Sequence, residues 1–180
     1  MAAAQSFLSL ARFETLYENQ KPHYEYWFGE AIQKDMPTSL HGIVQPLLAM
    51  LLYQRGWKAA TEVRLKLSAL AQPVPDVIAD AKRIQLPYPT EPFDLCIEIL
   101  SPGDEIRKVF PKAAHYLDWG IASVWIIDPD QRKAYSMTRE SPSPVEVDMA
   151  GSLTAGTAEA AISLTLKELF AEVDKMLGTN

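Results

Sequence analysis

The feature that most constrains this chain is a pair of acidic residues set into apolar runs. Between residues 75 and 129 the sequence reads PDVIAD, then FDLCIEILSPGDE, then KAAHYLDWG, then VWIIDP. Asp76 precedes one apolar run, and Glu98 lies well inside the next, between Ile97 and Ile99. A buried carboxylate is costly unless a cation or several hydrogen bonds compensate it. Acids at such positions in predicted strands therefore indicate a functional site.

Composition sets the class of protein. The 180 residues are 48% hydrophobic, enough for a proper core, so we expect one domain over residues 1–180. No apolar run reaches the roughly 18 residues that span a bilayer, and the first ten residues lack the basic start of a signal peptide. We therefore expect a cytoplasmic protein without membrane contact. The lone Cys96 lies among apolar residues, which predicts a buried structural thiol.

The net charge of −6 bears on the partner. It argues against a broad basic surface for nucleic acid, because phosphate binding depends on Lys and Arg. Metal ions held by acidic residues can offset part of that objection. Nucleic acid therefore stays among the possible substrates, provided that a cation is bound.

Apolar spacing predicts four helices. Pro46 lies inside the second, so this helix is expected to start late or to bend there. Ser101, followed by Pro102, resembles a cap for the third helix, and Pro111 is expected to kink that helix or restart it. The predicted helices are Ser6–Tyr17, with Ser6 or Ser9 as cap, Ser39–Arg55, Asp104–Asp118 and Leu164–Leu177.

Alternation and apolar runs predict a mixed central sheet with a buried middle, flanked by the helices. The fold class is therefore α/β, or more loosely α+β. In Thr61–Leu67 the alternation places Glu62, Arg64 and Lys66 on a solvent face. The other predicted strands are a hairpin over His23–Gln33 that carries Glu25, then Gln72–Ala79, Asp94–Leu100, Ser123–Asp128, Lys133–Thr138 and Val145–Met149.

Side-chain parity along the strand Asp94–Leu100 brings acids together. Asp94 and Glu98 point to the same face, and Asp76 can lie across from them in the neighbouring strand. Converging carboxylates repel unless cations are present, and hard oxygen ligands suit Mg²⁺ or Mn²⁺. Alternatively, Asp76 and Asp94 sit at strand ends and bind local backbone. Glu98, inside its strand, does not fit that alternative.

A lysine on the following helix is the candidate counter-charge. Lys108, Lys112 and Tyr116 are spaced four apart, which places them on one face of a continuous helix. By composition alone, the alternative is a solvated surface lysine.

Together these residues carry a family resemblance. The order of the following residues resembles the Uma-two family: Glu25 with Gly29-Glu30, His41 before a leucine-rich helix, Pro75-Asp76, Asp94-Leu95 with Glu98, Ser101-Pro102, Lys112, Tyr116, Gly120, and Trp125 with Asp128-Pro129. That family is similar to the restriction endonucleases of the PD-(D/E)XK superfamily. The resemblance covers nearly the whole chain and implies a restriction-endonuclease-like fold.

The resemblance also assigns roles. It implies that Asp76 and Glu98 bind the metal, and that Lys112 supplies the lysine that superfamily members carry two residues after the second acid, where this chain has Leu100. Glu25 and His41 match recurrent polar positions of the family. His41 near a helix start is equally well explained as a terminal residue.

The function implied is Mg²⁺- or Mn²⁺-dependent hydrolysis of phosphodiester bonds in DNA by a homodimer. Two alternatives remain open from the residues. One is a catalytically silent binding module, favoured by Leu100, Pro111 and the negative charge. The other is a hydrolase of a small phosphate compound, which an acidic surface would tolerate better.

Overall fold

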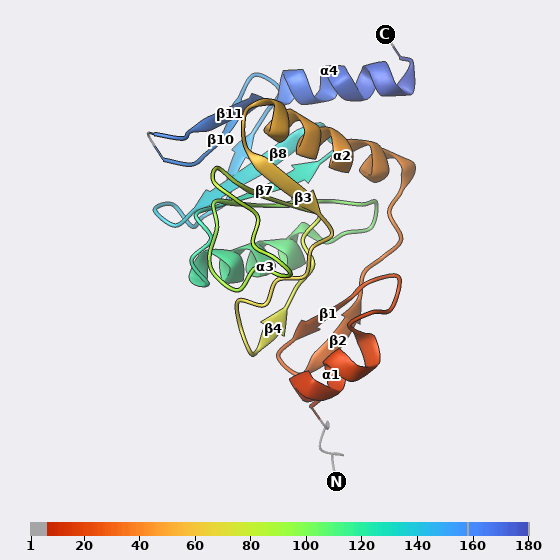
Figure 1. Cartoon of the computed structure of the whole chain (residues 1–180). Coiled ribbons are helices and arrows are strands. Elements are labelled where there is room, and N and C mark those ends of the chain that lie inside the picture. Colours follow the sequence, from red (N-terminus) through yellow and green to blue (C-terminus); the bar gives the residue numbers. More distant parts are fainter. Residues whose placement is uncertain (1–6, 158, 180) are drawn as a thin grey trace.

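A six-stranded mixed sheet lies at the centre of the computed structural model, which describes residues 7–157 and 159–179 (Figure 1). The strand order is β3-β5-β6-β7-β8-β9, with β6 and β7 parallel and the other neighbours antiparallel. The predicted mixed sheet is thus confirmed. Its strands are β3 (Lys58–Thr61), β5 (Val77–Asp80), β6 (Leu95–Ile99), β7 (Ser123–Asp128), β8 (Lys133–Thr138) and β9 (Val145–Val147).

Smaller sheets accompany the central one. The predicted hairpin over His23–Gln33 is confirmed as β1 (Tyr24–Trp27) and β2 (Glu30–Gln33), which form a three-stranded sheet with β4 (Ala71–Gln72). A further hairpin pairs β10 (Ser152–Ala155) with β11 (Ile162–Thr165) and was not predicted.

Helices cover both faces of the central sheet. In the described part of the chain the helices are α1 (Leu10–Tyr17), α2 (Ser39–Gln54), α3 (Ile106–Asp118) and α4 (Leu166–Leu177). In Figure 1, α2 and α4 lie on one side of the sheet and α3 on the other, while α1 lies beside β1 and β2. Within the described ranges no helix combines the length and apolar character needed to cross a membrane.

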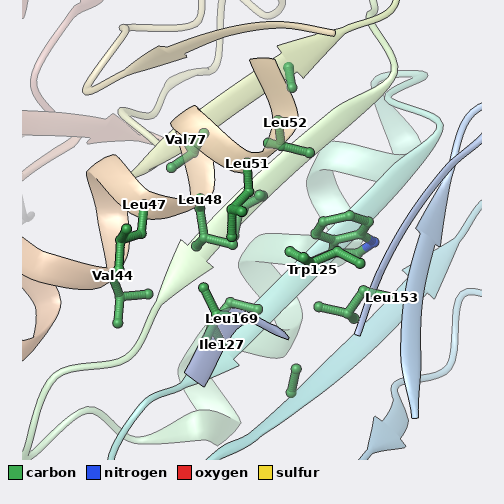
Figure 2. Packing of buried hydrophobic residues seen from close by; sticks show 14 of the residues in the cluster. Val44, Leu47, Leu48, Leu51, Leu52, Val77, Trp125, Ile127, Leu153 and Leu169 are labelled. Atoms are coloured by element: carbon green, nitrogen blue, oxygen red, sulfur yellow. The ribbon is translucent and has the colours of Figure 1, made fainter. Parts of the chain in front are cut away.

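The larger core lies between the sheet and the helices α2 and α4. Leu48 and Leu51 from α2 approach Trp125 and Ile127 from β7, and Leu169 from α4 joins them (Figure 2). A second core, between the sheet and α3, contains Cys96 from β6. The predicted buried thiol is confirmed, since Cys96 is free and fully buried.

Pro46 and Pro111 both lie inside continuous helices. Helix α2 begins at Ser39, with Thr38 as its N-cap, and continues through Pro46. Helix α3 continues through Pro111, so the predicted restart there is wrong. At the first helix the cap is Ser9; Ser6 lies outside the described residues.

The predicted cap of the third helix is also wrong. Helix α3 begins at Ile106, and its N-cap Glu105 makes no side-chain cap hydrogen bond. Ser101 and Asp104 close a tight turn instead, in which the Ser101 backbone N–H donates to Asp104 Oδ2 over 2.6 Å. Because Gly103 has a φ of 101°, the chain reverses here before the helix starts.

The predicted strand Thr61–Leu67 is wrong beyond its first residue. Strand β3 ends at Thr61, and Glu62 adopts a left-handed φ of 55° that breaks the extended run. Arg64, expected in solvent, is 4% exposed and donates to the Gln72 carbonyl. The alternation came from a loop with one buried apolar residue, Leu65, whose N–H pairs with the Pro73 carbonyl.

The predicted strand Gln72–Ala79 is divided in two. β4 ends at Gln72, and β5 begins at Val77. Pro73 and Pro75 lie between them, and neither has the N–H that a continuous ladder requires. As a result, Asp76 directly precedes a strand of the central sheet.

Two glycines that follow helices should respond differently to a methyl group. Gly56 and Gly120 both have positive φ, 87° and 97°, but a Cβ at Gly56 meets open space while one at Gly120 would lie 2.8 Å from Pro92 Cγ. We expect Gly56→Ala to lower the free energy of unfolding by about 1 kcal/mol through backbone strain alone. Gly120→Ala should cost roughly 1 kcal/mol more through overpacking. Denaturant unfolding measures both, and equal losses would contradict the close approach to Pro92.

Candidate active site

Strand register brings Asp76 and Glu98 to the same side of the sheet. β5 and β6 pair with Val77 opposite Ile97, so that the next residues outward, Asp76 and Glu98, face each other. Val77 and Ile97 both pack on the α2 side, and their neighbours therefore point to the side covered by α3. The predicted common face is confirmed. Both acids are buried, with Asp76 2% and Glu98 7% exposed.

Asp76 is held by residues from three separate segments of the chain. Its Oδ2 accepts the Ile99 backbone N–H over 2.7 Å, which ties it to the end of β6. Its Oδ1 accepts from Lys34 Nζ over 2.8 Å and lies 3.5 Å from His41 Nε2 at the start of α2. Burial alone would raise the pKa of Asp76, but the hydrogen bond with His41 and the charge of Lys34 outweigh it and hold that pKa well below its usual range. Asp76 is therefore a carboxylate at neutral pH.

Glu98 has the opposite electrostatic environment. Its Oε1 accepts from the Tyr116 hydroxyl over 2.6 Å and lies 3.0 Å from Lys112 Nζ. Burial raises the pKa of Glu98 to about 7, although the charge of Lys112 acts to lower it. Within the described part of the chain, Glu98 Oε2 has no hydrogen-bond partner. That oxygen is available to a further cation.

Lys112 reaches the site because α3 is continuous. Its Nζ lies 2.9 Å from Glu25 Oε1 and 3.0 Å from Glu98 Oε1. Burial alone would lower the pKa of Lys112, but the charges of Glu25 and Glu98 raise it well above its ordinary value, so the ammonium stays charged. Lys108, one turn earlier, is 76% exposed and pairs with Glu105. Lys108 is therefore a solvated surface lysine, and Lys112 is not.

Glu25 positions this lysine from the hairpin. Besides Lys112, its Oε1 accepts the Val74 backbone N–H over 2.8 Å, and its Oε2 accepts Trp27 Nε1–H over 2.9 Å. Burial alone would raise the pKa of Glu25, yet Lys112 and these hydrogen bonds lower it. In addition to the two acids and Lys112, the sequence suggested four supporting residues: Glu25, His41, Asp94 and Tyr116. All of these except Asp94 contact the site.

Asp94 is the exception. It lies before β6, at the end of the strand away from Glu98, and its Oδ2 accepts the Ala81 backbone N–H over 2.9 Å. Asp94 therefore lies at a strand end and binds backbone, as the alternative proposed, but its partner belongs to the segment after β5 and not to its own turn. Asp94 and Glu98 are four residues apart, roughly 13 Å along an extended strand, so a shared face would not bring them into contact.

The sequence analysis missed Lys34, Gln45 and Glu62. Lys34 Nζ lies 3.2 Å from both carboxylate oxygens of Glu62 and 2.8 Å from Asp76 Oδ1. Gln45 Nε2 donates to Glu62 Oε1 over 3.0 Å and to the Asp76 carbonyl over 2.8 Å. The spacing of four between His41 and Gln45 could have revealed Gln45, because it puts both on one helix face. No periodicity marks Lys34 or Glu62.

The donor set suits a hard divalent cation. Asp76, Glu98, Lys34 and Lys112 border a cavity of about 180 Å³. Ligand atoms of His41, Glu62 and Asp76 lie within 4.8 Å of one another. Carboxylate oxygens are the ligands that Mg²⁺ and Mn²⁺ prefer. The residues present therefore fit such an ion. Asp76 belongs both to the pair with Glu98 and to the group with His41 and Glu62.

Comparison with known proteins agrees with this geometry. The Uma2 family model, described as "Putative restriction endonuclease", matches residues 10–167. The chain belongs to the Uma2 family. A solved structure described as a "putative nuclease belonging to DUF820", from Anabaena variabilis, is 26% identical and superposes with a TM-score of 0.74, covering 92% of this chain and 99% of the other. No curated protein matches. The predicted family and fold are confirmed, and both comparisons support a nuclease.

In this Uma2 protein the buried ion pairs should be needed for stability. Lys112→Met leaves the carboxylates of Glu25 and Glu98 without their ammonium, and we expect the free energy of unfolding to fall by about 3 kcal/mol. Adding Glu25→Gln should recover part of that loss, because one of the two uncompensated charges is removed. Denaturant unfolding at neutral pH measures both effects.

Lys108→Met is the matched control, since Lys108 is on the same helix and exposed. It should leave the midpoint of unfolding unchanged. If Lys112→Met also left the midpoint unchanged, the ammonium of Lys112 would not compensate the two buried acids.

Proposed function

We propose that this protein is a metal-dependent endonuclease that hydrolyses phosphodiester bonds in DNA. The observation that carries the proposal is the opposition of Asp76 and Glu98 on β5 and β6, with the Lys112 ammonium 3.0 Å from Glu98. Two acids and a lysine in one cavity are the groups that such hydrolysis needs. The family description and the similar solved structure support the same reaction class.

Asp76 and Glu98 would hold Mg²⁺ or Mn²⁺. When bound, such an ion lowers the pKa of a water molecule that it holds and stabilises negative charge on the phosphate. The remaining roles belong to the chain itself. Tyr116 fixes the position of Glu98 through its 2.6 Å hydrogen bond, and the Ile99 backbone N–H fixes Asp76.

Lys112 would orient the attacking water or neutralise charge that develops on the phosphate. Its ammonium is held between Glu25 and Glu98, so it is positioned before substrate arrives. Leu100, which stands where related nucleases carry their lysine, is buried in the apolar core beneath α3. The charge that Leu100 lacks is thus available from α3, which weakens the argument for a catalytically silent module.

We further propose that the protein acts as a homodimer, since two sites would allow both strands of a duplex to be cut. Size-exclusion chromatography with light scattering tests the dimer.

A second cavity, of about 550 Å³, adjoins the proposed site and is lined by Glu25, Trp27, Lys108, Lys112 and His115 among others. A cavity of this size leaves room for a substrate larger than a single phosphate group.

Metal binding is the first test. We expect wild-type protein to bind Mn²⁺ in calorimetry, and the Asp76→Asn/Glu98→Gln variant to lose this binding because two anionic ligands are gone. Both replacements keep the side-chain shape, and the circular dichroism spectrum checks that the fold remains. Undiminished binding by a folded double variant would refute the assignment of the two ligands.

Cleavage is the second test. With Mg²⁺, Lys112→Met should cut plasmid and single-stranded DNA at least a hundredfold more slowly than wild type while Mn²⁺ still binds, because the lost ammonium acts on the reacting phosphate. Lys108→Met should retain nearly full activity. Equal losses in the two variants would indicate general phosphate attraction along α3, and cleavage of a small phosphate ester but of no DNA would favour the alternative substrate class.

A further inference from the structure

The ammonium of Lys34 occupies a position built like a cation site. Its Nζ lies 2.8 Å from Asp76 Oδ1, 2.9 Å from the Val74 carbonyl and 3.2 Å from each carboxylate oxygen of Glu62. These partners are all oxygens, and they come from two separate segments of the chain. Hard oxygen donors gathered around one charge are also what Mg²⁺ or Mn²⁺ requires.

The surroundings hold this position in place. Glu62 has a left-handed φ of 55°, a conformation that a residue with a side chain adopts only when its surroundings fix it. Gln45 Nε2 donates to the Glu62 carboxylate and to the Asp76 carbonyl, which fixes the two relative to each other. His41 Nε2, 3.5 Å from Asp76 Oδ1, adds a nitrogen donor. Without the ammonium, His41, Glu62 and Asp76 would form a metal site of ordinary composition.

The two ammonium groups hold different parts of the site. Lys34 pairs with Glu62 and Asp76, and Lys112 pairs with Glu25 and Glu98. Asp35 and Asp104 also line the cavity, so the two lysines do not balance all of its carboxylates. A divalent ion bound by His41, Glu62 and Asp76 would have to displace the ammonium of Lys34 or lie beside it.

We propose that Lys34 is a built-in second cation, which takes the place of a second metal ion and restricts the site to one divalent ion. This inference rests on the proposed nuclease function. Asp76 would share its carboxylate between the bound ion and Lys34, and Glu62 would hold the ammonium in place. The protein would then carry out with one ion and a lysine what other nucleases do with two ions.

The test is the number of Mn²⁺ ions bound per chain, measured by calorimetry and by the electron paramagnetic resonance of free Mn²⁺. We expect one ion in the wild type and two in Lys34→Met. Lys34→Gln, which keeps a hydrogen-bond donor but no charge, should also bind two and guards against a folding defect of the methionine variant. Lys112→Met removes the same charge from the Glu25 and Glu98 side, and it should bind one.

A double variant locates the additional ion. Lys34→Met/Glu62→Gln lacks a ligand of the vacated position and should return to one ion per chain. One ion in both single Lys34 variants, with unchanged affinity, would overturn the inference. So would two ions in Lys112→Met, because loss of charge rather than the position of Lys34 would then admit the second ion. Two ions in the wild type would overturn this inference and leave the proposed nuclease intact, whereas no ion in any of these proteins would overturn both.

Discussion

Compensation of buried carboxylates by lysines from distant segments is the interaction on which this structure depends. Glu25, Asp76 and Glu98 are each less than a tenth exposed, a state that would be strongly unfavourable without cations. Lys112 joins α3 to the hairpin and to β6, and Lys34 joins the hairpin to the segment before β5. The same contacts that assemble the cavity therefore fasten the small sheet and α3 to the central sheet.

This dependence explains why the prolines matter. Pro73 and Pro75 end one strand and delay the next, so that Asp76 lies just outside the ladder. Its Oδ2 then accepts the Ile99 N–H at the far end of β6, which a residue inside the ladder could not do. Pro111, in contrast, leaves α3 continuous, and the helix delivers Lys112 and Tyr116 to Glu98 from one face.

Sequence reasoning reached the site in two ways. Glu98 is marked by its position between two isoleucines, whereas spacing alone does not separate Lys112 from Lys108, and the family resemblance was needed to single out Lys112. The structure brings Glu98, Lys112 and Tyr116 together. Lys34 and Glu62 carry no such mark, because their meeting depends on how the hairpin docks and on a left-handed residue after β3. The strand predicted over Thr61–Leu67 failed for the same reason: a buried loop can alternate in polarity when its polar side chains, such as Arg64, find partners inside.

The two central acids differ in a way that bears on how a cation would be held. Asp76 accepts a backbone N–H and an ammonium, and its lowered pKa keeps it ionised throughout the neutral range. Glu98 accepts a tyrosine hydroxyl, and burial raises its pKa to about 7, so near neutrality it carries its full charge only when further positive charge is present. Asp76 is thus ionised throughout the neutral range, whereas the ionisation of Glu98 depends on the positive charge near it. Under the proposed function, Asp76 and Glu98 would both have to be ionised to hold an ion, so ion binding would be coupled to release of a proton from Glu98 to solvent.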